Sequence, residues 1–201
     1  GTLLDPPGTY MDQLAVCAGA QGKIDIKAPL EHNIKAVADG CGKEMGEVTV
    51  AILERERNQH YIDAARAAGA RVVLFEHGTV AHGIAPSLKH WDIDMMVGSG
   101  GAPEAVITAA GLKCLGGDMQ AVLTPHNDVF LKQAEEKGMK LDTVYGLDDL
   151  VRSDAMFVAT GVSPSSILPG INFESDEIIA HSLVMRSISG THRVIESHYK
   201  I

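Results

Sequence analysis

Short apolar runs typical of strands alternate with helical patterns through the middle of this chain, and the alternation restricts the folds open to it. The first pair is the β-branched run 48–53 followed by a helical pattern that ends at Gly69. Strands separated by helices need crossover connections, which place parallel strands side by side. We therefore predict an α/β fold with a mainly parallel sheet and helices on both faces. Further strands are predicted at 71–75, 93–97 and 119–123, and further helices at 80–88, 103–110 and 128–137.

The C-terminal part of the chain has a different pattern. A short helix is predicted at 147–151, followed by a strand at 156–161. Two later apolar runs, 182–187 and 193–196, are separated by Ser189-Gly190-Thr191. This arrangement predicts a terminal β-hairpin.

Charge and cysteine content exclude several classes of protein. The 201 residues contain 17 Lys and Arg against 26 Asp and Glu, a formal charge of −9 with no basic block, which argues against nucleic acid as a partner. Cys17, Cys41 and Cys114 have no spacing typical of zinc sites or disulfide frameworks, so free thiols in a reducing cytoplasm are expected. No apolar segment approaches the length that spans a bilayer, so no membrane association is expected.

The segment 97–104, Val-Gly-Ser-Gly-Gly-Ala-Pro-Glu, is the strongest local indication of a ligand site. Gly98, Gly100 and Gly101 predict a tight loop that opens into a helix with Pro103 in its first turn. A small anion or a metal would fit there, near Glu104. The alternative is that Glu104 only complements the helix dipole. The spacing does not match the G-x-G-x-x-G dinucleotide fingerprint.

Three loops are predicted at the carboxyl ends of strands, where sheets of this kind bind ligands: 54–57, 76–79 and 98–104. Arg55 and Arg57 stand at alternate positions after the first strand, so their guanidinium groups could bind one phosphate from the same side. The alternative is a solvated cluster balanced by Glu54 and Glu56. His77 lies in the second of these loops.

Several longer motifs resemble the class II fructose-1,6-bisphosphatase family of metal-dependent sugar phosphatases. The resemblance covers nearly the whole chain. The matching segments are Tyr10-Met11, Gly22-Lys23-Ile24-Asp25-Ile26, Gly100-Gly101-Ala102-Pro103-Glu104, Lys113-Cys114-Leu115-Gly116-Gly117, Ala159-Thr160-Gly161-Val162 and His181-Ser182-Leu183-Val184-Met185-Arg186-Ser187.

This resemblance implies hydrolysis of the 1-phosphate of fructose 1,6-bisphosphate or a related sugar bisphosphate, as a step of gluconeogenesis in the cytoplasm. Mg²⁺ or Mn²⁺ would be the cofactor, and a homo-oligomer is expected. In the matching motifs, Glu104 corresponds to a metal ligand and Gly101 to a backbone contact with the ligand. Substrate-binding positions correspond to Tyr10, Arg55, Arg57, His77 and Thr79.

Two of the binding motifs depart from the family pattern. The family usually has D-G-D where this chain has His77-Gly78-Thr79, and neutral His and Thr cannot replace two carboxylates that accept hydrogen bonds from sugar hydroxyls. The usual (K/R)-P-R is Arg55-Glu56-Arg57, which places an acid beside the expected phosphate. Weaker binding of fructose 1,6-bisphosphate, or a different ligand, is the expected consequence.

Two metal-binding motifs of the family, E-G-E and D-P-x-D-G-T, do not occur in this chain. We therefore expect an incomplete part of a longer enzyme, with no catalytic residue of its own and no activity in isolation. The expected layered fold comprises residues 1–30 as the edge of a truncated mixed-sheet domain, 31–165 as the C-terminal α/β domain, and 166–201 as strands returning to the sheet. An exposed apolar edge is expected at the N-terminal end.

Two other functions remain open. A non-catalytic sugar-phosphate-binding or interaction protein would explain both the altered triplet at His77 and the missing metal motifs. A nucleotide-binding oxidoreductase domain is supported only by the parallel sheet and the glycine segment.

Overall fold

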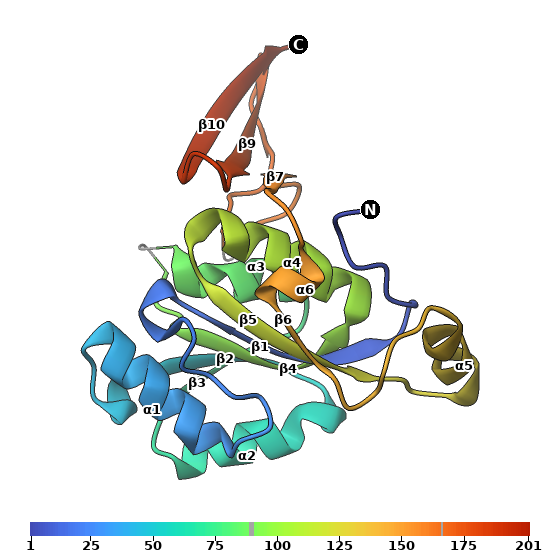
Figure 1. Ribbon diagram of the computed structural model, residues 1–201. Coiled ribbons are helices and arrows are strands. Elements are labelled where there is room, and N and C mark those ends of the chain that lie inside the picture. Colours follow the sequence, from blue (N-terminus) through green and yellow to red (C-terminus); the bar gives the residue numbers. More distant parts are fainter. Residues whose placement is uncertain (89–90, 166) are drawn as a thin grey trace.

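The computed structural model describes residues 1–88, 91–165 and 167–201, which form two sheets (Figure 1). The larger sheet has six strands in the order β3-β2-β4-β1-β5-β6. Its strands are β1 (Tyr10–Val16), β2 (Thr49–Leu53), β3 (Arg71–Phe75), β4 (Met95–Gly101), β5 (Asp118–Thr124) and β6 (Val144–Gly146).

Four of these six strands run in one direction, which confirms the predicted α/β class. β2 is parallel to both β3 and β4. β1 pairs antiparallel with β4 on one side and with β5 on the other, and β6 is antiparallel to β5. Because β1 lies inside the sheet with a partner on each side, the apolar edge expected at the N-terminal end does not exist there.

Helices cover both faces of the larger sheet, as predicted (Figure 1). One apolar cluster joins α1 and α2 to the sheet, and a second joins α4 and α6 to its other face, where α3 packs beside α4. The α-helices are α1 (Leu30–Cys41), α2 (Gln59–Ala67), α3 (Thr79–Ile84), α4 (Ala102–Leu115), α5 (Asp128–Glu136) and α6 (Leu147–Leu150). Short 3₁₀ turns are η1 (Ala18–Ala20), η2 (Met45–Glu47), η3 (Glu56–Asn58) and η4 (Ala85–Ser87).

The predicted end of α4 at Gly111 was wrong, because the helix continues to Leu115 and ends at Gly116, whose φ is 77°. Gly111 is buried in the middle of the helix. A Cβ at this position would lie within 2.8 Å of two atoms of the Ile84 side chain on α3. The glycine therefore allows α3 and α4 to pack closely and is no helix stop.

The terminal strands were expected to return to the larger sheet, and they instead build a second, antiparallel sheet. It contains β7 (Met156–Thr160), β8 (Asn172–Phe173), β9 (Glu177–Arg186) and β10 (Thr191–Lys200), in which β9 pairs with the other three. Phe157, Leu183 and Met185 pack this sheet on α3 and α4, in a core that includes Ile84 and Cys114. The predicted hairpin is confirmed as β9–β10. The domain boundaries at 30 and 165 stay a prediction, and residue 166 lies outside the described residues.

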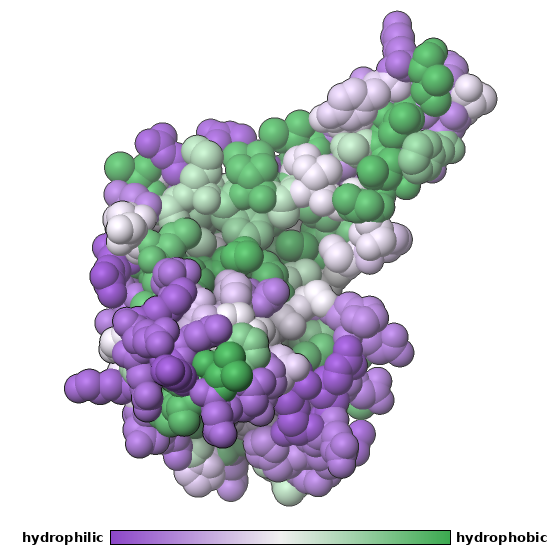
Figure 2. All heavy atoms as spheres, turned by 90° about the vertical axis from the view of Figure 1, so that its right-hand side faces the viewer, coloured by the Kyte–Doolittle hydropathy of each residue, from purple (hydrophilic) through white to green (hydrophobic). Residues whose placement is uncertain are grey.

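The β9–β10 hairpin extends away from the rest of the molecule (Figures 1 and 2). Figure 2 shows apolar side chains gathered along this arm. The large apolar residues exposed on the second sheet are Met156, Val158, Phe173, Val194, Ile195 and Tyr199. Among the described helices, none is long and apolar enough to cross a bilayer.

Candidate functional site

The glycine-rich segment predicted as a loop is the last part of strand β4. Residues 98–101 pair with residues 10–13 of β1 over the whole segment. The Ser99 amide donates to Asn58 Oδ1 at 2.7 Å. The loop prediction was wrong because a strand from the start of the chain supplies hydrogen-bond partners that local sequence does not reveal.

Two glycines of this segment make room for side chains from other elements. Gly98 has a φ of 148°, and a Cβ there would lie 3.1 Å from the Asn58 amide nitrogen. At Gly100 a Cβ would lie 2.9 Å from Nε2 of Gln13 and 3.2 Å from the methyl group of Thr79. Thr79, a predicted ligand residue, is thereby placed against the end of β4.

Asn58 is fully buried at the start of α2, and its side chain links the ends of β2 and β4 by hydrogen bonds. Its Nδ2 donates to the Leu53 carbonyl at 2.9 Å, while its Oδ1 accepts from the Ser99 amide. This residue was not among those predicted from the sequence. An amide side chain directly after the charged loop 54–57 is the signal that could have indicated it.

Arg57 and Tyr10, two predicted substrate residues, are in direct contact. The guanidinium carbon of Arg57 lies 4.3 Å from the centroid of the Tyr10 ring, a cation–π geometry. Arg57 Nε donates to the Ser99 carbonyl at 3.1 Å, and the Tyr10 ring also packs against His126, with centroids 4.8 Å apart. The two terminal nitrogens of Arg57 have no hydrogen-bond partner among the described residues and can therefore donate to an anion.

Arg55 and His77 are held differently from Arg57. Arg55 donates to the carbonyls of Glu54 and Glu76 at 2.6 and 2.9 Å, which links the ends of β2 and β3. His77 is exposed and makes no hydrogen bond to a described residue. Neither residue contacts Tyr10 or Glu104 in the described interactions.

The carboxylate of Glu104, in the first turn of α4, lies over Gly101. A Cβ at Gly101 would overlap Oε2 of Glu104, so a larger residue at this position would displace the carboxylate from where it lies. Gly101 is the register partner of Tyr10. Tyr10, Arg57, Thr79, Gly101 and Glu104 therefore meet at one end of β1 and β4, and we call these five residues the strand-end group.

The strand-end group does not form a metal centre by itself. No three His, Cys, Asp or Glu residues in the described part of the chain lie where they could hold a metal ion. Mg²⁺ requires near-octahedral oxygen coordination, and Glu104 is the sole carboxylate in the group. The residues present thus fit an anion better than a cation.

Asp12 is a further residue beside this group that the sequence analysis missed. It stands two positions after Tyr10 on β1, hence on the same face of the strand, and it is the register partner of Ser99. Burial raises the pKa of the Asp12 carboxyl above its usual range, an effect partly offset by hydrogen bonds from Ser99 and Tyr61 and by the charges of His60 and Arg57. The alternation of Tyr10 and Asp12 is the signal that could have indicated it.

His82 supports the turn that carries His77 and Thr79. Its ring stacks on Phe75 with centroids 3.8 Å apart, and its Nδ1 lies 2.9 Å from the Gly78 carbonyl. Burial lowers the pKa of His82, which favours the neutral ring in this position.

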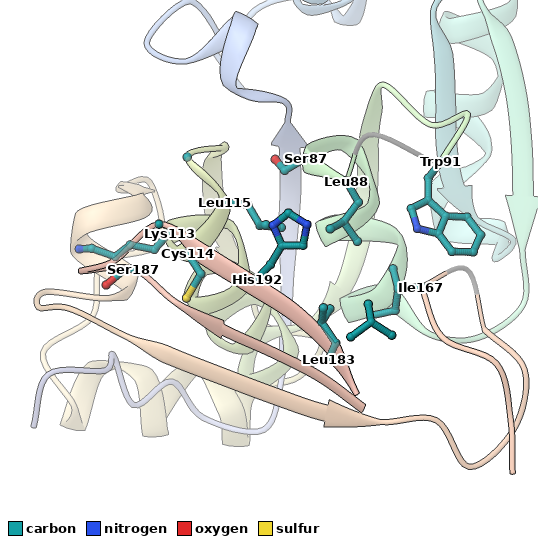
Figure 3. A pocket seen from close by; sticks show the side chains of 13 residues that line it. Ser87, Leu88, Trp91, Lys113, Cys114, Leu115, Ile167, Leu183, Ser187 and His192 are labelled. Atoms are coloured by element: carbon teal, nitrogen blue, oxygen red, sulfur yellow. The ribbon is translucent and has the colours of Figure 1, made fainter. Parts of the chain in front are cut away.

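A cavity lies elsewhere, between the C-terminal end of α4 and the β9–β10 hairpin (Figure 3). Its volume is about 550 Å³, and its lining includes Leu88, Cys114, Leu183 and His192. Cys114 and Glu104 are ten residues apart on α4, which corresponds to about 15 Å along the helix axis. The cavity is therefore separate from the strand-end group.

Comparison with known proteins identifies the family. The model of the bacterial, glpX-encoded fructose-1,6-bisphosphatase family matches residues 1–199. The chain is 36% identical to "Fructose-1,6-bisphosphatase class 2" of Haemophilus influenzae over 213 residues, which cover 98% of this chain and 64% of the relative. It is 35% identical to "Fructose-1,6-bisphosphatase 1 class 2" of Escherichia coli K12 over 214 residues, with 99% and 64% coverage. The chain thus spans slightly less than two thirds of these relatives' length. It belongs to the glpX-encoded, class 2 fructose-1,6-bisphosphatase family.

Proposed function

We propose that the strand-end group binds a phosphate group of a sugar bisphosphate. The observation that carries this proposal is the position of Arg57. Its guanidinium is oriented by the Ser99 carbonyl and the Tyr10 ring, and its terminal nitrogens have no partner among the described residues. An arginine held in this way loses little conformational freedom when it binds a phosphate, so its charge is available at low entropic cost.

The same proposal gives the protein the activity of its family: hydrolysis of the 1-phosphate of fructose 1,6-bisphosphate or a related sugar bisphosphate, as a gluconeogenic step in the cytoplasm. The names of the relatives, both fructose-1,6-bisphosphatases, support this substrate class. Tyr10, Arg55, Arg57, Thr79 and the Gly101 backbone would contact the substrate, with His77 at the edge of the site. We also propose that the enzyme acts as a homo-oligomer.

Mg²⁺ or Mn²⁺ is the cofactor we propose for the complete enzyme, in which Glu104 would be one ligand among several. The other ligands would come from residues outside these 201, because the described part contains no metal-binding cluster. We therefore expect no manganese-dependent phosphate release from the isolated chain. Release from fructose 1,6-bisphosphate, measured with a colorimetric phosphate assay, would contradict this expectation.

Binding of fructose 1,6-bisphosphate to the 201-residue protein, measured by isothermal titration calorimetry, tests the phosphate site. Arg57→Met keeps an apolar contact with Tyr10 and removes the charge, so we expect at least about tenfold weaker binding. Arg66→Met, an exposed arginine in the last turn of α2, is the matched control and should bind within twofold of the unaltered protein. Equal affinities for the Arg57 and Arg66 variants, or no binding by the unaltered protein, would overturn the proposal.

A non-catalytic sugar-phosphate-binding protein is the second candidate. The observation that favours it is the triplet His77-Gly78-Thr79, in which no side chain offers a carboxylate to sugar hydroxyls. Activity and binding measurements on the longest natural form of the protein distinguish the two functions. Phosphate release in the presence of Mn²⁺ supports the enzyme, and binding without turnover supports the second candidate.

A further inference from the structure

Cys17 and Cys41, which the sequence analysis treated as unrelated thiols, lie side by side. Their sulfur atoms are 2.9 Å apart, although the residues are 24 positions apart in sequence. Cys17 directly follows β1 and Cys41 is the last residue of α1, and both are partly exposed. An oxidant in solution can therefore reach this pair.

Backbone packing brings the two thiols together. The backbones of Gly19 and Gly40 are in close contact. A Cβ on Gly19 would lie 2.2 Å from the carbonyl oxygen of Gly40, and a Cβ on Gly40 would lie 2.3 Å from the carbonyl oxygen of Gly19. Any side chain at either glycine would separate η1 from α1. The approach of the sulfurs is thus a property of the fold and needs no loop rearrangement.

We propose that Cys17 and Cys41 are a modification site, at which a low-molecular-weight disulfide such as oxidised glutathione converts the two thiols into a reversible intramolecular disulfide. The thiolate of Cys17 attacks one sulfur of the oxidant, forms a mixed disulfide and releases one thiol. The thiolate of Cys41 then attacks the Cys17 sulfur of the mixed disulfide and releases the second thiol. The two protein thiols are oxidised by two electrons, the oxidant is reduced to two thiols, and the two protons of the cysteines pass to the released thiols.

The order of attack follows from the surroundings of Cys41. Burial, the hydrogen bond with Cys17 and the charges of Cys17 and Asp94 outweigh the opposing charge of Lys43 and raise the pKa of Cys41 to about 12, so this thiol keeps its proton at neutral pH. The raised pKa of Cys41 favours Cys17 as the first nucleophile. Once Cys17 is in a mixed disulfide, its contribution to the raised pKa of Cys41 is removed, which favours the second step.

The disulfide would lie far from the strand-end group. Cys17 follows Val16, whose partner on β4 is Met95, whereas Tyr10 at the other end of β1 pairs with Gly101. A seven-residue strand separates the two places by about 20 Å. We therefore expect oxidation to change stability and to leave ligand affinity at the strand-end group unchanged.

Alkylation and mass spectrometry test this inference directly. The folded protein is equilibrated in a glutathione buffer rich in the disulfide form, then denatured in acid and alkylated with N-ethylmaleimide. We expect one alkylated thiol per chain, Cys114, and a peptide map that shows Cys17 linked to Cys41. The melting temperature should rise by roughly 5–10 °C relative to the reduced protein, because the bond closes a long loop in the unfolded chain.

Two variants serve as controls. Cys114→Ser, which alters the buried cysteine, should form the same linkage, and Cys41→Ser should retain two alkylated thiols or carry a glutathione adduct on Cys17. Three alkylated thiols in the unaltered protein, stable glutathione adducts without the linkage, or an unchanged melting temperature after oxidation would each overturn the proposal. The unaltered protein alone decides the question if a variant does not fold.

Discussion

Single residues at the end of β1 and β4 have roles that follow from burial and charge. Arg57 is exposed and oriented by a ring and a carbonyl group, whereas Asp12, on the same strand face as Tyr10, is largely removed from water. A buried carboxyl group prefers its neutral form, because burial penalises the charged form. Burial therefore opposes the charged form of Asp12, while the nearby charge of Arg57 favours it.

The raised pKa of Asp12 predicts how stability responds to pH. The folded state disfavours the charged form of Asp12. The protonated carboxyl group therefore stabilises the fold below the ordinary aspartate pKa, and this stabilisation is lost as pH rises through the raised pKa. Asp12→Asn should therefore increase the free energy of unfolding at pH 7, and the gain should disappear below the ordinary aspartate pKa. Urea unfolding at several pH values measures this difference.

Asp142→Asn, an exposed aspartate in a loop, is the control for that measurement. It should change stability little at any pH. A loss of stability in Asp12→Asn at pH 7 would show that the charged carboxylate is stabilising and would contradict the effect of burial.

At the scale of elements, the second sheet carries its own charge network. On neighbouring strands of the arm, His181 lies 2.9 Å from Glu196, and His198 lies 3.0 Å from both Glu196 and Glu177. The two carboxylates raise the pKa of His198 above its ordinary value, and the two histidines lower the pKa of Glu196. The network thus favours a charged His198 in the paired hairpin.

NMR titration of the histidine rings tests this network. The pKa of His198 should lie above the ordinary histidine value and should fall in Glu196→Gln, whereas Glu174→Gln, outside the network, should leave it unchanged. Since the folded pKa is raised, the stabilisation is present below the ordinary histidine pKa and disappears as pH rises through the raised one. A His198 pKa that does not respond to Glu196→Gln would contradict the contacts described.

Elements whose identity depends on local pattern were predicted well. The strand Arg71–Phe75 and the hairpin β9–β10 follow from apolar runs and a glycine turn. The assignments at Gly98–Gly101 and Gly111 failed because distant partners decide them: β1 pairs with the first segment, and Ile84 packs on the second. Helix α1 was not predicted.

The residues of the candidate site likewise fall into those that were predicted from local motifs and those that were missed. Motif resemblance indicated Tyr10, Arg57 and Glu104, which the structure brings to one strand end. Asp12, Gln13 and Asn58 were missed because their importance depends on burial, and burial is set by elements far away in the sequence. Gln13 illustrates this: its Nε2 donates to the Gly101 carbonyl 88 positions away.

For the whole molecule, two features lie at separate ends of the central strand β1: the strand-end group near Tyr10 and the thiol pair at Cys17. A third feature, the cavity of about 550 Å³, lies beneath the arm. We propose that the ligand binds at the strand-end group and not in this cavity.

Mapping of amide and arginine Nε chemical shifts by NMR during titration with fructose 1,6-bisphosphate tests this assignment most directly. We expect the largest changes at Arg57 Nε and at the amides of Ser99, Gly100 and Gly101, with little change at Cys17 or at Cys114 and Leu183 in the cavity. Changes concentrated around Cys114 and Leu183, with Arg57 and Gly101 unaffected, would contradict the account.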